Sequence, residues 1–199
     1  QEVLERFGHS AVESEAGAEL AKCLGSVKYR SSPPDFAGAR ESFEEARRRL
    51  FQSGMLRTSG GADVLLNLGS SVRQLGDLDG ALATYEEALC IYEEMGSLET
   101  AAGAKLLNSI GALTSIRGDH ASALQIYERA RIIREQTCTL ATPEAVALFE
   151  NIGIAEENRG HLAAALEAYQ EARRRCESIG LAEHKLGRQV QERIDALRS

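Results

Sequence analysis

The amino-acid sequence predicts an all-α solenoid built from about four helix-turn-helix repeats and closed by a C-terminal capping helix. The main observation is a motif, "GDLDGALATYEEAL" at Gly76, that returns at Gly118 and Gly160. Three of its positions keep a step of 42 residues through four copies. Composition agrees, because the 199 residues include 43% apolar but only 5% aromatic residues and three prolines, which suits closely packed helices.

An aromatic residue with an alanine on either side defines each repeat. In the four copies the aromatic is Phe43, Tyr85, Tyr127 and Tyr169. The flanking alanines are Ala39 and Ala46, Ala81 and Ala88, Ala123 and Ala130, and Ala165 and Ala172. Because alanine lets helix backbones approach closely, we expect the aromatic to fill the gap between its own helix and the first helix of the next repeat.

A second apolar segment precedes each copy of the motif. Its apolar residues are spaced by three and four, which predicts a helix with one packed face. Leu65 and Leu68 belong to this face in the second repeat, and Leu24 and Gly25 take their part in the first. A glycine able to adopt a left-handed conformation ends the later segments at Gly76, Gly118 and Gly160. Asp then caps the following helix in two cases, so each repeat is helix A, a turn and helix B.

These signals set the domain organisation. We predict one domain over residues 1–199, with repeats at approximately 13–54, 62–96, 104–138 and 144–180 and a capping helix at 182–198. The "SSPPD" turn, Ser31 to Asp35, replaces the glycine turn in the first repeat. We interpret residues 1–8 as the tail of a preceding helix B, and the start at Gln1 as a processed form or a fragment. In the capping helix an apolar stripe lies opposite a charged face; the stripe is Leu186, Val190, Ile194 and Leu197.

Charge and hydropathy exclude several classes of protein. The net charge of −7 is the wrong sign for a general nucleic-acid binder. No apolar run approaches the roughly 20 residues that span a bilayer, so we expect a soluble intracellular protein, cytoplasmic or organellar, with no direct membrane insertion. Cysteine spacing predicts neither a metal site nor a disulfide framework, and we expect buried, reduced thiols. The cysteines are Cys23, Cys90, Cys138 and Cys176.

The combined pattern L-x-x-[LI]-G, G-[DH] and A-x-x-x-Y-x-x-A resembles the tetratricopeptide repeat from roughly Ala18 to Gly180. The usual period of that family is about 34 residues. A 42-residue period is similar to the kinesin light chain subclass, as is the stretch from Tyr127 to Gly153, with Pro143 before the next helix A. The resemblance implies a right-handed superhelix, an α-solenoid, whose A helices line a concave groove for a peptide or helix. The paired asparagines typical of the subclass are single here: Asn67, Asn108 and Asn151.

We expect the groove to be lined by A-helix residues of every repeat. An asparagine there can both donate to and accept from a peptide backbone. The predicted groove residues are Lys22, Ser26, Tyr29, Arg30, Asn67, Ser70, Arg73, Lys105, Asn108, Ser115, Glu150, Asn151 and Glu157.

A sharper variant is the clamp with which chaperone-binding members of the family hold a C-terminal carboxylate, using Lys, Asn, Asn, Lys and Arg. This sequence has Lys22, Ser26, Asn67, Lys105 and Ser109 at those positions. The missing arginine removes a bidentate donor for carboxylate. The plainer interpretation of Lys22 and Lys105 is that they are solvated surface lysines.

No other group of residues predicts chemistry. Arginine runs at Arg47–Arg49 and Arg173–Arg175 are typical of solvated helix faces or inter-repeat ion pairs. The histidines are isolated, and capping accounts for His120 and His161, which sit at turn-to-helix junctions. We therefore predict no catalytic residue, no metal and no cofactor.

The sequence thus favours a non-enzymatic protein-binding module, an adaptor or assembly scaffold that holds a peptide or helix of another protein in its groove. The alternative is a structural subunit docked into a larger complex through outer helix faces or ends. An enzyme would need a pocket that brings a histidine within hydrogen-bond reach of Cys or Glu.

Overall fold

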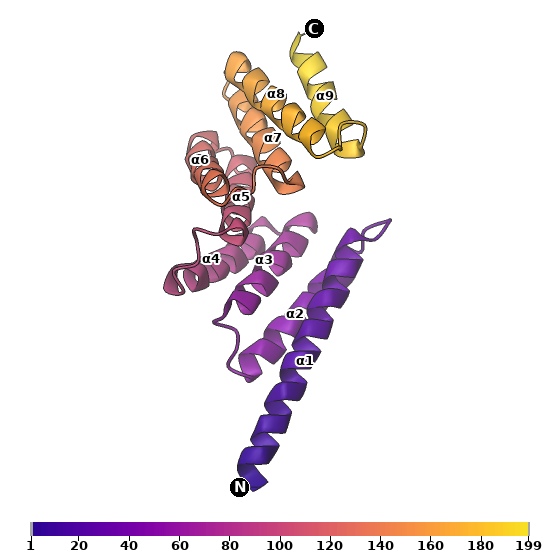
Figure 1. Ribbon diagram of the computed structural model, residues 1–199, viewed down its shortest axis with the longest axis vertical. Helices are drawn as coiled ribbons and strands as arrows, with labels where there is room; N and C mark the ends of the chain where they lie inside the picture. The colour runs from indigo at the N-terminus through magenta and orange to yellow at the C-terminus, as the bar shows by residue number, and fades with distance from the viewer. Residues whose placement is uncertain (1, 199) are drawn as a thin grey trace. The chain divides into compact units, whose positions relative to one another are not determined.

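The chain is helical throughout the part that the structure describes. The structure is a computed structural model that describes the backbone of residues 2–198 and the side chains of residues 15–198. This part holds nine α-helices and no strand (Figure 1). It divides into two compact units, of which unit 1 ends at Leu98 and unit 2 begins at Glu99.

Unit 1 contains two helix hairpins. Helix α1 (Glu2–Arg30) pairs with α2 (Phe36–Gln52), and α3 (Ser59–Gln74) pairs with α4 (Leu78–Glu94). Packing of α2 against α3 joins the hairpins. Because α1 runs unbroken from Glu2, the interpretation of the first residues as the tail of a separate helix was wrong.

Unit 2 contains the other two hairpins and the cap. Helix α5 (Ala101–Ile116) pairs with α6 (His120–Gln136), and α7 (Pro143–Asn158) pairs with α8 (Leu162–Ser178). Packing of α6 against α7 joins the hairpins, and α9 (Lys185–Arg198) packs against α8. The prediction of four all-α repeats followed by a capping helix is confirmed.

The predicted turn chemistry is present. The φ angles of 89°, 92° and 78° lie in the left-handed region that glycine adopts without strain, and they belong to Gly76, Gly118 and Gly160. The Asp77 carboxylate accepts a hydrogen bond from the Gly80 N–H at 2.8 Å, and the Asp119 carboxylate accepts one from the Ser122 N–H at 3.0 Å. Helix B therefore begins at a side-chain cap in the second and third repeats.

The aromatic of each helix B packs on a glycine of helix A in the same repeat. A Cβ added to Gly69 would lie 2.5 Å from the Tyr85 ring, and one added to Gly111 would lie 2.6 Å from the Tyr127 ring. The aromatic therefore packs on the A helix of its own repeat, a contact that was not expected, and Tyr169 also shares a cluster with Val190 and Ile194 of the following helix α9, as expected. The glycine lies 16 residues before the aromatic in the second to fourth repeats and 18 before it in the first, and the antiparallel hairpin brings these two positions together where the helices cross. All eight flanking alanines are buried, as expected.

The first A helix departs from the others. Leu24, expected on the packed face, is 49% exposed, whereas Leu68 at the equivalent position of α3 is 3% exposed. The physical reason is the neighbour, because α2 packs against α3 and no helix precedes α1 in the described part of the chain.

The cysteines correct another expectation. Cys23, Cys90 and Cys138 are exposed and only Cys176 is buried, while all four are free thiols. Cys23 and Cys90 lie on outward helix faces and Cys138 lies in the turn after α6, where a small thiol exposes little apolar area.

Candidate peptide-binding surfaces

In unit 1 the predicted groove residues come from the neighbouring A helices α1 and α3. The Lys22 Nζ atom forms an ion pair with the Glu19 carboxylate at 2.7 Å. Lys22 also lines a pocket of about 400 Å³, whose wall includes Leu50, Met55 and Val64. At this end of unit 1, the charge of Lys22 is therefore offset by Glu19, and the adjacent pocket wall is apolar.

At the other end of these two A helices, side-chain hydrogen bonds connect neighbouring helices. The Tyr29 hydroxyl accepts a hydrogen bond from Gln74 Nε2 at 3.4 Å, and its ring meets the Phe36 ring edge-on, with centroids 5.2 Å apart. The Ser70 hydroxyl accepts from the Tyr85 hydroxyl at 3.2 Å. Tyr29 and Ser70 thus help to hold the helices together as well as lining the surface.

The other predicted residues of unit 1 lie along these two helices. Ser26, Asn67 and Arg73 are half-buried, and Arg30 is exposed with its Nε donating to the Ser26 carbonyl oxygen at 3.2 Å. Unit 1 contains Lys22 and Asn67 of the suggested carboxylate clamp, and Lys105 belongs to unit 2. The clamp stays a prediction, and the Glu19 carboxylate already offsets the charge of Lys22.

In unit 2 two predicted asparagines are brought together. Asn151 Nδ2 donates to Asn108 Oδ1 at 3.0 Å, which links α7 to α5. Both side chains are half-buried, as is Lys105 one turn before Asn108. This bond uses one donor of Asn151 and the carbonyl oxygen of Asn108, and it does not involve the Asn108 amide group or the Asn151 carbonyl oxygen.

Two predicted groove residues of α7 are in contact with the capping helix. Glu150 is 7% exposed and accepts from Gln189 Nε2 at 2.8 Å, with Arg193 Nε at 3.6 Å. Glu157 accepts from the Tyr169 hydroxyl at 2.7 Å and lies 3.8 Å from Arg193 Nη1. Helix α9 therefore already engages the part of the α7 surface that carries Glu150 and Glu157.

Ser115 does not lie on an open surface either. It is 8% exposed, and its hydroxyl is 3.0 Å from His120 Nδ1 at the α5–α6 turn. His161 occupies the N-cap position of α8 but makes no capping hydrogen bond, so that expectation was wrong. Its Nδ1 is instead 2.8 Å from the Glu156 carboxylate. The His161 side chain is 53% exposed at a turn. This pair therefore does not meet the criterion for an enzyme, which requires a histidine and a glutamate held together in a pocket.

Burial controls the titration of Glu150. Burial away from water raises the pKa of its carboxyl group above the ordinary value, whereas Arg193 and the hydrogen bond from Gln189 lower this pKa. The carboxyl group thus favours folding most when it is protonated.

Replacing Glu150 with glutamine is expected to stabilise the chain by an amount that grows as the pH rises above the ordinary glutamate pKa of about 4.3. A raised folded-state pKa means that the contribution of Glu150 is present below its unfolded pKa and is lost as pH rises through the folded pKa. Urea unfolding of both proteins over a series of pH values measures the difference. A difference that stays constant or narrows with rising pH would contradict the assignment.

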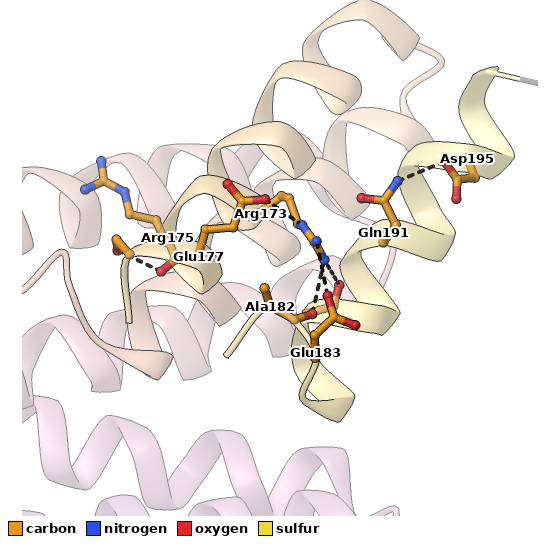
Figure 2. Close-up of polar contacts among 9 residues, drawn as sticks. Arg173, Arg175, Glu177, Ala182, Glu183, Gln191 and Asp195 are labelled. Carbon is orange, nitrogen blue, oxygen red and sulfur yellow. Dashed lines mark hydrogen bonds and ion pairs between the residues drawn. The ribbon is translucent and has the colours of Figure 1, made fainter. Parts of the chain in front are cut away.

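The arginine runs form the expected ion pairs. Arg47 reaches across repeats to Glu87 at 2.7 Å. Arg173 holds the α8–α9 turn, since its Nη1 donates to the carbonyl oxygens of Ala182 at 3.1 Å and Gly187 at 3.2 Å (Figure 2). These arginines orient helices, and α9 is fixed by main-chain as well as side-chain contacts.

A second pocket, of about 600 Å³, was not expected from the sequence and is lined by residues of α2, α4 and the α2–α3 loop. Its wall includes Leu56 and Phe51, which is 73% exposed, beside Arg47 and Arg57. Both arginines are already paired with glutamates of α4. The only sequence signal is an aromatic residue two positions after the basic run of α2, which the periodic pattern does not require.

Two further kinds of site are absent from the described residues. None of their helices is long and apolar enough to cross a membrane. They also contain no group of three or more His, Cys, Asp or Glu side chains arranged to hold a metal ion.

Solved structures with this arrangement of helices are known. The chain is similar to BtubC (BKLC) from P. vanneervenii, with a TM-score of 0.64 and 15% identity over 96% of this chain and 91% of the other. It is also similar to a putative kinesin light chain of Podosopora anserina with nearly identical TPR-like repeats, with a TM-score of 0.63 and 13% identity over 94% and 96%. A point variant of that second protein gives 0.64 and 14%, over 96% of both chains. These likenesses show the fold.

Family models give the sequence-level assignment. A tetratricopeptide repeat model matches residues 35–103 and a second one matches residues 104–138, together more than half of the chain. A comparison with curated proteins gives no match. With four helix hairpins built on the predicted repeat positions, the chain belongs to the tetratricopeptide repeat proteins and has the fold of their kinesin light chain-like members.

Proposed function

We propose that the chain is an adaptor or assembly factor that binds an extended peptide segment of a partner protein along its A helices. Tetratricopeptide repeats generally mediate protein–protein interactions and scaffolding. The observation that carries the finer proposal is the hydrogen bond between Asn151 and Asn108, which fixes two neighbouring amides on α7 and α5.

The asparagine pair suits a peptide backbone. An extended peptide presents alternating N–H and C=O groups, and the pair retains the Asn108 amide donors and the Asn151 carbonyl acceptor. Both side chains are half-buried, so hydrogen bonds made there are less exposed to competition from water. Such contacts hold a backbone without reading its sequence.

Selectivity would come from the surroundings of the pair. In unit 2 Lys105 lies one turn from Asn108, and Glu157 adds a carboxylate on α7. Unit 1 has a surface of its own, where the pocket beside Lys22, with its wall of Leu50, Met55 and Val64, has room for an apolar side chain. Ser115 and Glu150 are buried, so the proposed surface omits them.

Replacing Asn108 or Asn151 with alanine is expected to weaken the affinity for a bound peptide by about tenfold, or about 1.4 kcal/mol, because a ligand polar group then loses its partner. Peptides selected from a phage-displayed library on the intact chain are the probes, and calorimetric titration measures their affinity. Asn158→Ala is the matched control, since Asn158 is an exposed asparagine at the end of the same helix α7.

Unchanged affinity in both variants would remove the asparagine pair from the binding surface. Equal loss in all three variants would point to a general change in the fold, which circular dichroism detects. The proposal therefore requires loss at positions 108 and 151 together with full binding at position 158.

The pocket between α2 and α4 favours a second candidate function, docking into a larger complex through the outer helix faces. Its support is Phe51, a large aromatic that is 73% exposed beside Leu56. Under this alternative Phe51→Gln would abolish capture of the partner complex while Asn151→Ala would leave it intact. The peptide-binding proposal predicts the reverse pattern.

A further inference from the structure

Helix α1 carries an apolar stripe that no other helix covers in the described part of the chain. Leu20, Leu24 and Val27 are 71%, 49% and 66% exposed, and the smaller Ala16 and Cys23 beside them are exposed as well. Residues three and four apart lie on one side of a helix, so these side chains form one continuous face.

The same face is buried in A helices that have a helix before them. In α3 the positions equivalent to Leu20 and Leu24 are Val64 and Leu68, which are 1% and 3% exposed, and α2 packs against this helix. In α7 the equivalent Leu148 is fully buried, and α6 packs there. This face of an A helix therefore normally packs against the helix that precedes it. In α1 no helix packs on the equivalent face among the described residues.

Charge along α1 indicates what kind of helix fits. The Glu19 side chain is 62% exposed and lies before the stripe's midpoint, and Glu15 one turn earlier is also exposed. Arg30 is exposed beyond the other end of the stripe. Lys22 pairs with Glu19 at 2.7 Å and offsets part of this negative charge, which leaves Glu15 and Glu19 as the acidic end of the edge and Arg30 as its basic end. A second α1 running antiparallel has the complementary order of charges.

We propose that α1 is a self-association surface on which two copies of this chain pair antiparallel about a two-fold axis. In this arrangement Leu20 of each copy faces Val27 of the other, and Leu24 and Cys23 lie near the axis. Glu19 of each copy then lies within reach of Arg30 of the other. The pairing is isologous, so each favourable contact occurs twice.

Side-chain size supports close pairing. Helices pack at interaxial distances of about 8–10 Å when the residues between them allow it, and Ala16 and Cys23 are small. One helix face is less than a standard interface, so the dimer should form reversibly and depend on protein concentration. The apolar stripe faces away from the predicted groove, because helical spacing turns Lys22 and Tyr29 to the side of α1 opposite Leu20 and Val27. Its edge is shared with the proposed peptide surface, since Ala16 and Glu19 also line the pocket beside Lys22.

Sedimentation equilibrium over a concentration series tests the pairing. The wild-type mass should rise from 21.6 kDa towards twice that value as concentration increases. Leu20→Glu combined with Val27→Glu should weaken association by about tenfold or more, because it places carboxylates against the partner's apolar stripe. Leu162→Glu is the matched control, since Leu162 is an equally apolar side chain, 53% exposed, in the first turn of α8.

A mixing experiment identifies the partner helix. Glu19→Arg alone and Arg30→Glu alone should each be monomeric, because each sets like charges opposite one another twice. An equimolar mixture of the two variants should dimerise again, since every pair across the axis is then of opposite sign. With Cys90→Ser and Cys138→Ser in the background, a short bismaleimide should link the two copies through Cys23.

A wild-type chain that stays monomeric at every concentration would overturn the proposal. So would a mixture of the two charge variants that fails to dimerise, because the stripe would then receive some other helix. Circular dichroism of each variant confirms that the helices are intact, which the exposure of all four substituted side chains leads us to expect.

Discussion

Replacing Tyr85 with alanine is expected to lower the free energy of unfolding by about 3–5 kcal/mol. The ring is completely buried between α4 and α3 and lies directly on Gly69. Its hydroxyl also donates to Ser70 at 3.2 Å. The nearest positions along helix B are Ala81 and Ala88, which are already small and buried, so they cannot fill the cavity. Urea unfolding followed by circular dichroism measures the loss.

The partner substitution Gly69→Ala tests the same contact from the other helix. Alanine favours a helix over glycine by about 1 kcal/mol, but a Cβ there would lie 2.5 Å from the ring, so a net loss of about 1–3 kcal/mol is expected. Gly60→Ala is the matched control, because its Cβ would meet only the Thr58 hydroxyl at 3.7 Å. Once Tyr85 is alanine, Gly69→Ala should no longer destabilise the chain. An undiminished loss in the double variant would contradict this packing.

The repeat architecture could be predicted because its determinants are local and recur. A glycine turn, an Asp cap and small residues at fixed spacing each act within one hairpin. Gly76 and Asp77 show this, since both conformation and capping hydrogen bond are as the sequence indicated. The same local signals could not tell which helix faces Tyr85, because a gap beside helix B has two possible neighbours and sequence order favours neither.

The candidate site could be predicted less well because burial there depends on distant segments. The A-helix pattern placed Asn108 and Asn151 on the ligand side, and the structure joins them by a hydrogen bond. The same pattern placed Glu150 there, but it has Gln189 and Arg193 of α9 against it. Position within a helix fixes the direction of a side chain. Whether that direction is open to a ligand depends on the capping helix, whose approach no local spacing encodes.

Substituting Val190 with aspartate is the second large expected effect, with a loss of about 3–5 kcal/mol. Val190 is completely buried in the cluster that includes Phe149 and Tyr169, so an aspartate there is an unpaired charge in apolar surroundings. The aspartate regains contact with water if α9 detaches from the α7–α8 hairpin. Hydrogen exchange should then show that the amides of α9 lose protection early while those of α5 and α6 stay protected. Ala196→Asp on the exposed side of α9 is the control and should change stability by less than about 1 kcal/mol. Full protection of α9 in the Val190 variant would mean that polar contacts of Arg173 and Arg193, rather than the apolar stripe, hold the cap.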